Sequence, residues 1–172
     1  LTNFHNVDTP AAAILIGPNG HFSQIVSNTI GPTPTDVRGL NSKYDSTHAT
    51  NLWIEANRFQ WTRDHTMGID GWNITVTNNT FENTNGWDAN ICTASDTVFT
   101  HNTFTNVSNG GSPNHTDVIQ VDAFSSTTEI STNVIFEANL VINCAGTQIG
   151  QLSGTPSTNT IGWWTFRNNV FI

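Results

Sequence analysis

Val76-Thr77-Asn78-Asn79-Thr80-Phe81 is the stretch that decides the fold, because its pattern returns along the chain. An apolar residue is followed by two residues, an Asn, one further residue and a second apolar residue. Phe99-Thr100-His101-Asn102-Thr103-Phe104 repeats it 23 residues later. The equivalent Asn recurs with spacings of 29, 22, 23, 37 and 30 residues, at Asn28, Asn57, Asn79, Asn102, Asn139 and Asn169. Such near-regular spacing indicates a repeat architecture.

Each repeat reads as short strands joined by turns. A second residue expected to point inward lies two positions before the opening apolar residue of each repeat. This separation is the period of a β-strand, and the residues are Ser23, Leu52, Ile74, Thr97, Val134 and Trp164. One short strand cannot bury its apolar side, whereas stacked rungs pair their backbones at about 4.8 Å and enclose a core. We expect each recurring Asn to turn the chain in a left-handed conformation and to form a ladder of side-chain hydrogen bonds. Phe59, Phe81 and Phe104 are expected to stack inside.

These features resemble the right-handed parallel β-helix of the pectate-lyase-like superfamily. The resemblance covers nearly the whole chain and concerns the fold rather than the activity. It implies an all-β, right-handed, single-stranded parallel β-helix of about five turns with an Asn ladder and no visible caps. We expect residues 1–172 to be one such domain and a fragment of a longer chain. Like chains or missing segments would then cover the helix ends, where Trp163-Trp164-Thr165-Phe166 would lie.

The charge and the composition of the chain limit the classes of partner that it can bind. The 172 residues carry 5 basic and 13 acidic side chains, a net charge of −8, which argues against binding of nucleic acid or an anionic membrane. No apolar run approaches the roughly 18 residues of a membrane span. The scarcity of lysine favours a secreted or cell-surface location. Cys92 and Cys144 are the two cysteines of the chain, and the sequence allows either a disulfide between them or two free thiols. Asn-x-Ser/Thr sequons at Asn73, Asn78, Asn106 and Asn114 are weak evidence of glycosylation in so Asn-rich a chain.

The resemblance implies a substrate groove along the third strand of each rung and its flanking loops. Aligning the rungs on an apolar residue gives one expected outward column of Asn41, Asp70, Cys92, Gln120 and Gly150. A second column, at the loop edge, would contain Asp36, His65, Trp87, His115 and Ala145. Trp87 would form an aromatic shelf between His65 and His115, on which the apolar face of a sugar ring can stack.

Candidate site residues follow from these columns. Imidazole and carboxylate groups can exchange protons with a substrate, so the candidate catalytic residues are His65, Asp70, His115 and Asp117. The candidate substrate-binding residues are Arg38, Trp87, Asp88, Gln120 and Gln148. Calcium is a candidate cofactor at the Asp residues, although no ligand set is assigned. In the alternative interpretation each His or Asp only closes a turn through a backbone hydrogen bond, and His48 is assigned by default to such a structural or solvent-facing role.

The function expected is extracellular carbohydrate binding or polysaccharide degradation, by a lyase or a hydrolase. The alternative is a non-catalytic structural or adhesive module of a surface protein, spike or extracellular filament. Motifs of polygalacturonases are absent, and Trp61-Thr62-Arg63-Asp64-His65 only partly matches the Trp-Ile-Asp-His run of pectate lyases. Because the net charge of −8 repels anionic polymers, neutral or calcium-bridged sugars fit better. Thr75-Val76-Thr77 and Thr103-Phe104-Thr105 do not recur on every rung, which disfavours an ice-binding face.

Overall fold

The structure is a computed structural model, and only part of the chain is described below. The described residues are 11–17, 20–34, 37–42, 48–63, 65–85, 89–108, 116–123, 130–144, 148–154 and 160–172. Of these, only the backbone is described at 11, 91, 121–123, 130, 148–154, 160 and 161. This part of the chain contains sixteen strands and no helix, so the expected all-β class is confirmed.

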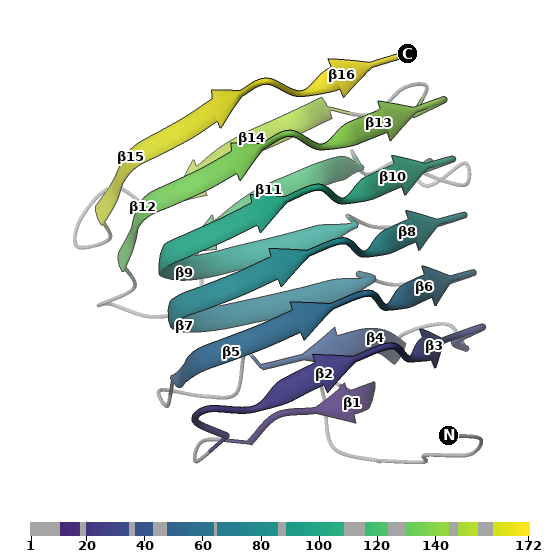
Figure 1. Cartoon of the computed structure of the whole chain (residues 1–172), viewed down its shortest axis with the longest axis horizontal. Helices are drawn as coiled ribbons and strands as arrows, with labels where there is room; N and C mark the ends of the chain where they lie inside the picture. Colours follow the sequence, from purple (N-terminus) through teal and green to yellow (C-terminus); the bar gives the residue numbers. More distant parts are fainter. Residues whose placement is uncertain are drawn as a thin grey trace.

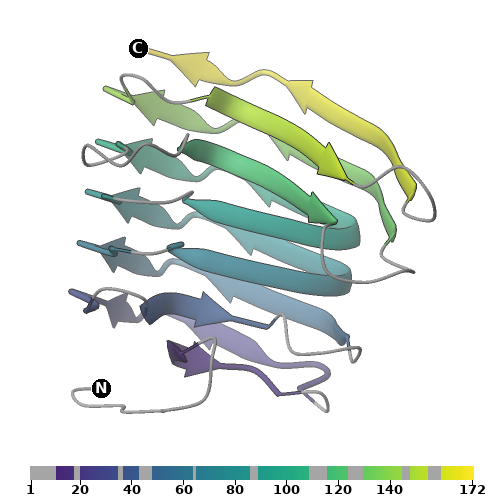
Figure 2. The ribbon, with the colours of Figure 1, turned by 180° about the vertical axis from the view of Figure 1, so that it is seen from behind.

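The strands stack as a parallel β-solenoid with three walls (Figure 1). A ten-stranded sheet forms two of the walls, and β7 (Met67–Thr77) and β9 (Asn90–Thr100) bend from one wall into the other. The back wall (Figure 2) also contains β1 (Ala11–Leu15), β4 (Val37–Asn41), β11 (Asp117–Ala123) and β14 (Gln148–Gly154). The front wall also contains β2 (Gln24–Val26), β5 (Ala49–Glu55), β12 (Ile130–Glu137) and β15 (Thr160–Arg167).

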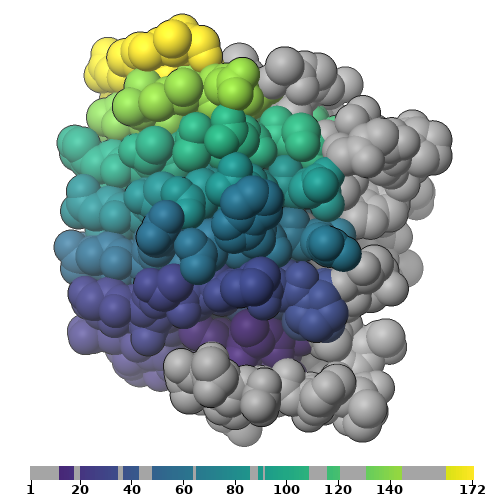
Figure 3. Space-filling model, turned by 90° about the vertical axis from the view of Figure 1, so that its right-hand side faces the viewer, coloured from purple at the N-terminus to yellow at the C-terminus, as the bar shows by residue number. Residues whose placement is uncertain are grey.

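The third, narrow wall is a six-stranded sheet of very short strands. It comprises β3 (Thr29–Ile30), β6 (Arg58–Gln60), β8 (Thr80–Glu82), β10 (Thr103–Thr105), β13 (Leu140–Ile142) and β16 (Val170–Phe171). Every strand pairing between rungs is parallel. The rungs follow one another in sequence order and appear as successive colour bands in the space-filling view (Figure 3). The repeat read from the recurring Asn is therefore the rung of the solenoid, while its right-handedness stays a prediction.

The expected Asn ladder is confirmed between the front and narrow walls. In each of its five steps, from Asn28 to Asn169, the backbone N–H donates to the side-chain Oδ1 of the Asn on the following rung at 2.9 Å. The side-chain Nδ2 donates to the same oxygen at 3.0–3.1 Å. From Asn57 onward, each Nδ2 also donates to a backbone carbonyl of the preceding rung, as Asn102 does to Val76. The ladder thus satisfies backbone groups at a corner that strand pairing cannot reach.

The expectation that the ladder Asn itself turns the chain is wrong. The left-handed conformation, with φ of 51–57°, belongs to the residue immediately before it: Ser27, Ala56, Asn78, His101, Ala138 and Asn168. That residue reverses direction, so the following Asn can point inward and is buried at the central rungs. Two further columns of left-handed residues mark the other corners, six residues before the ladder Asn (Phe22, Asn51, Asn73, Asp96, Asn133 and Trp163) and four residues after it (Trp61, Asn83, Asn106 and Asn143).

Aromatic rings fill the core beside the narrow wall, as the sequence predicted. Phe59 and Phe81 are fully buried and lie parallel, with ring centroids 4.9 Å apart, and Phe104 continues the stack at 4.8 Å. These distances match the spacing of paired strands, so one ring occupies each rung. Buried aliphatic residues of the front wall, such as Ile54, Ile74 and Val76, complete the core.

Both cysteines are free thiols, so the disulfide that the sequence left open does not form. Cys92 is fully buried in the core of the back wall. Cys144 is half-buried after β13, and burial raises the pKa of its thiol, an effect that backbone hydrogen bonds at Val107 and Ile142 only partly oppose.

Candidate functional site

A hollow lies outside the corner where the back wall turns into the front wall; we call it the corner hollow. Its volume is about 300 Å³, at the lower end of the range for small-ligand sites. The lining residues come from three neighbouring rungs: His48, Asp70, Gly71, Trp72, Thr93, Ser95 and Asp96.

Parallel strand register brings these side chains together. Ala49 pairs with Gly71, and Gly71 pairs with Ala94, so His48, Asp70 and Thr93 occupy the preceding position on successive rungs. Trp72 is paired with Thr50 on one side and with Ser95 on the other. Side chains that are distant in sequence therefore stand one strand spacing apart, at about 4.8 Å.

Gly71 makes the close approach of β5 and β7 possible. Its φ is +127°, and an added Cβ would fall inside the van der Waals radius of the Ala49 carbonyl oxygen. A side chain at this position would push the two strands apart and displace His48 from Asp70. Glycine is consequently the residue that this corner requires.

His48 and Asp70 form the polar centre of the hollow. His48 Nδ1 lies 3.1 Å from Asp70 Oδ2, without the alignment of a straight N–H···O hydrogen bond. The Asp70 side chain is 3% exposed and the His48 side chain 35% exposed, so the carboxylate is buried while the imidazole remains partly accessible. The Asp70 backbone N–H donates to Ser42 Oγ at 3.2 Å, which adds to the pairing that holds β7 in place.

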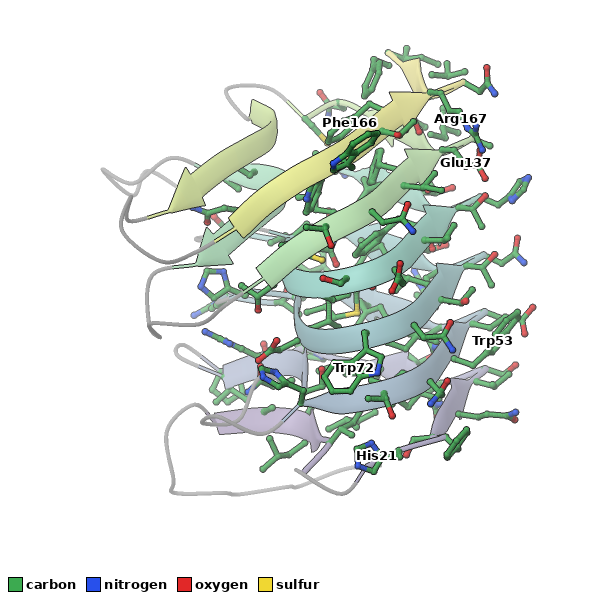
Figure 4. All side chains as sticks on the ribbon, turned by 90° about the vertical axis from the view of Figure 1, so that its left-hand side faces the viewer. His21, Trp53, Trp72, Glu137, Phe166 and Arg167 are labelled. Atoms are coloured by element: carbon green, nitrogen blue, oxygen red, sulfur yellow. The ribbon has the colours of Figure 1, made fainter. Side chains whose placement is uncertain are left out.

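Trp72 supplies an aromatic surface beside this pair. Half of its side chain is exposed, and its ring centroid lies 5.8 Å from that of His48 at an interplanar angle of 51°. Figure 4 shows Trp72 on the β7 ribbon at the corner, with His21 on a lower rung and Trp53 farther along the front wall. An exposed indole beside a carboxylate and an imidazole is suited to a ligand that has one apolar face and polar edges.

The upper edge of the hollow is held by side-chain hydrogen bonds to the next rung. Asn133 Nδ2 donates to Asp96 Oδ1 at 2.7 Å, and the Thr132 backbone N–H donates to Ser95 Oγ at 3.1 Å. Thr93 is buried and donates to the carbonyl oxygen of Ile69 at 3.4 Å. Asp96 is exposed at a left-handed corner position, so its carboxylate faces solvent.

Five of the nine residues predicted as a site have described side chains, and among these five only Asp70 lines the corner hollow. Arg38 is half-buried on β4 and donates from Nη1 to Asn41 Oδ1 at 3.0 Å. His65 is buried two residues before β7. Asp117 is fully buried at the start of β11, where it pairs with Gln148, and Gln120 is buried on the same strand. Trp87, Asp88 and His115 lie outside the described residues, as does the Gln148 side chain.

The expected outward column on the back wall is wrong in register. Asn41 pairs with Gly68, Gly68 with Ile91, and Ile91 with Gln120, so Asp70 stands two positions further along, opposite Thr93. Cys92 is inward in the core rather than outward. An apolar residue after a loop of variable length does not fix the register, and a slip of one residue, as at Cys92, moves a side chain to the other face.

Sequence reasoning missed most of the hollow. His48 was assigned to a structural or solvent-facing role, and Trp72, Thr93, Ser95 and Asp96 were not considered. The signal that was available is the corner position six residues before the ladder Asn, which is Asn73 on one rung and Asp96 on the next. The two residues next to these corners, Trp72 and Ser95, line the hollow.

Calcium as a cofactor stays a prediction that the described residues do not support. Within the ranges given above, no group of three or more His, Cys, Asp or Glu side chains is placed to hold a metal ion.

Comparisons with known proteins add no family to this description. The chain matches no protein-family model, no curated protein and no solved structure. In the parts of the chain that are described, there is no helix with the length and hydropathy needed to cross a membrane.

Proposed function

We propose that this chain is an extracellular carbohydrate-binding or polysaccharide-degrading β-solenoid, and that the corner hollow is its sugar site. The observation that carries the proposal is the half-exposed Trp72 ring beside the His48–Asp70 pair. The C–H face of a sugar ring stacks on an indole, while its hydroxyls need polar partners at the rim. The hollow combines both features in about 300 Å³, which is room for one or two sugar rings at a time.

The solenoid suits a linear polymer, because its rungs repeat at about 4.8 Å, close to the length of one sugar unit. A polysaccharide lying along the axis would meet equivalent corners on successive rungs. Whether bound polymer is cleaved, by lyase or hydrolase chemistry, is the finer part of the proposal and requires an acid–base group, for which the hollow offers His48 and two carboxylates. Secretion or cell-surface display is proposed on composition alone.

The test is binding to a panel of immobilised neutral and charged polysaccharides, compared between wild type and Trp72→Ala. Loss of one stacking surface is expected to weaken binding about tenfold or more. Trp61→Ala is the matched control, because Trp61 is also an exposed tryptophan at a corner but lies beside the narrow wall. Absence of binding to the whole panel, or equal loss in both variants, contradicts the proposal.

The alternative, a non-catalytic structural or adhesive module, is favoured by one observation. Apolar side chains of β15 and β16 are exposed, including Phe166 at 42% and Phe171 at 48%, and Phe166 is seen near the upper edge in Figure 4. Their counterparts one rung below, Phe136 and Val141, are buried. In this alternative a further rung, from a like chain or a further segment, covers that edge. Concentration-dependent association in analytical ultracentrifugation that Phe166→Ser and Phe171→Ser abolish would support it; a monomer at all concentrations would not.

A further inference from the structure

Apart from the indole N–H of Trp72, which only donates, the polar side chains among the described lining residues of the corner hollow can all accept a hydrogen bond. Asp70 and Asp96 are carboxylates, Thr93 and Ser95 carry hydroxyls, and His48 has two ring nitrogens. Among the described lining residues there is no lysine or arginine. The lining is therefore suited to a ligand rich in hydroxyl or amine donors and lacks the cations that an acidic ligand requires.

Asp70 decides which nitrogen of His48 carries the proton. Nδ1 is buried and lies 3.1 Å from the carboxylate oxygen, so a proton on Nδ1 lets the two groups attract. With the proton on Nε2 instead, the unprotonated Nδ1 would lie 3.1 Å from a carboxylate oxygen and the two acceptors would repel each other. The contact is not straight in this structure, so the inference requires the imidazole to turn toward the carboxylate when a ligand binds. The neutral ring is then the Nδ1–H tautomer, and Nε2 presents a lone pair.

The accessible part of His48 is the part that holds Nε2. The side chain is 35% exposed although Nδ1 is buried, so the exposed area belongs to the rest of the ring. Asp70 itself is held in the middle of an eleven-residue strand that pairs with β5 on one side and β9 on the other. A buried, fixed carboxylate that orients an accessible imidazole makes Asp70 a positioning residue and His48 the group that meets the ligand.

Resting on the proposed function, we propose that the corner hollow selects neutral or amino sugars and rejects uronic acids. A ring hydroxyl donates to His48 Nε2 while the apolar face of the sugar lies on Trp72. A uronate would bring its carboxylate toward Asp96, with no cation among the described lining residues to offset the repulsion. The selectivity is therefore set by the site itself, in addition to the overall charge of −8.

The experiment compares three β-1,4-linked hexasaccharides of glucose, of glucosamine and of glucuronic acid, by calorimetry at one pH and ionic strength. His48→Leu removes the acceptor, His48→Gln restores one through its amide oxygen, and His101→Leu is the matched control at an exposed histidine on another corner. We expect the glucose or glucosamine hexamer to bind wild type at least 100-fold more tightly than the glucuronic acid hexamer. His48→Leu should weaken binding about fivefold to tenfold, in keeping with one lost hydrogen bond, with partial recovery in His48→Gln and no change in His101→Leu.

A readout without sugar tests the role of Asp70. Long-range ¹H–¹⁵N correlation spectra of the neutral imidazole should show His48 as the Nδ1–H tautomer in wild type, and Asp70→Ala should move the proton toward Nε2. An Nε2–H tautomer in wild type overturns the inference. Equal or tighter binding of the glucuronic acid hexamer, lost in Trp72→Ala, also overturns it while the proposed function stands. No Trp72-dependent binding of any hexamer removes both.

Discussion

At the scale of the single residue, each ladder asparagine satisfies several partners that no other side chain can serve together. The Asn102 side chain accepts two hydrogen bonds from Asn79 and donates two, to the Val76 carbonyl and to Asn139 Oδ1. The amide is the neutral group that offers an oxygen acceptor and two N–H donors in one plane. An aspartate would accept in the same way but could not donate to the two oxygens.

Asn102→Ala is therefore expected to lower the free energy of unfolding by about 3–5 kcal/mol, because buried N–H and C=O groups lose their partners. The measurement is urea denaturation followed by circular dichroism. Asn106→Ala is the control: Asn106 lies in the exposed corner column, where Nδ2 donates to Asn83 at 3.0 Å and water can replace the bond. A loss in Asn106→Ala as large as that in Asn102→Ala would contradict this account.

The residue before the ladder Asn carries backbone strain on rungs where it is neither Asn nor Gly. Ala56 has a φ of 53°, whereas Asn78 occupies the same position on the next rung with a φ of 54°. Asn tolerates this region better than Ala. Ala56→Asn is thus expected to raise the unfolding free energy by about 0.5–1 kcal/mol. The same change at Ala13, inside strand β1, should lower it, since Asn is unfavourable in strands; stabilisation at both sites would refute the assignment to the corner.

The thiol of Cys144 allows a pH prediction. Because burial raises its pKa, less thiolate is present at neutral pH than in a free cysteine, and alkylation by iodoacetamide should be slow. The rate should climb at a higher pH than it does for glutathione, as followed by mass spectrometry. Cys92 is fully buried and should react only when the chain unfolds. Denatured protein, in which both thiols are solvated, is the control and should follow the glutathione profile.

At the scale of the element, the fold could be predicted because its signals are local and repeated. The six-residue pattern identifies one rung. The spacing of its Asn along the chain predicts that the rungs stack, whatever the conformation of the loops between them. The left-handed position was misplaced by one residue, because Asn suits that conformation and occupies it at Asn78 and Asn168. Ala56 and His101 occupy the equivalent left-handed position on other rungs, so this position does not require Asn. The residue that must be Asn is the inward one that follows it.

The candidate site was much less predictable than the rungs. Back-wall strands follow loops of different lengths, so an alignment on apolar residues slipped, and Asp70 was matched to Cys92 instead of Thr93. His48 carries no motif, and its role depends on its pairing position opposite Asp70, which only the strand register reveals. The corner position six residues before the ladder Asn points to Trp72 and Ser95, but which side chains gather beside them across rungs is set by long-range pairing.

A substitution in the phenylalanine stack would test the packing between strands β6, β8 and β10. Phe81 lies between two rings at 4.9 and 4.8 Å, so truncation would leave a cavity that neither neighbour can fill without losing its own rung. Phe81→Ala is expected to lower the unfolding free energy by about 3–5 kcal/mol. Phe22→Ala, at a ring that is 77% exposed, should change it by less than about 0.5 kcal/mol in the same denaturation assay. Similar effects in both variants would contradict the stacked core.

At the scale of the whole molecule, a solenoid is a one-dimensional array in which each rung contacts only its neighbours. Stability is then shared unequally, because a central rung is covered on both sides. The backbone N–H groups of the ladder Asn residues allow the stability of each rung to be compared, because each donates to the same kind of acceptor at 2.9 Å. Asn57, Asn79 and Asn102 are buried, whereas Asn28 is only half-buried.

Protection of these N–H groups from native-state hydrogen exchange should therefore be higher at the central rungs than at the outer rungs. We expect the N–H groups of Asn57, Asn79 and Asn102 to exchange only through global unfolding, with the free energy measured in urea. Asn28 should exchange through a smaller opening of its outer rung, with a free energy at least about 1–2 kcal/mol lower. In Asn102→Ala the loss should be greatest for rungs adjoining the mutation, as neighbour coupling requires. Equal protection at all four sites would show instead that the described rungs unfold as one cooperative unit, and the nearest-neighbour account would fail.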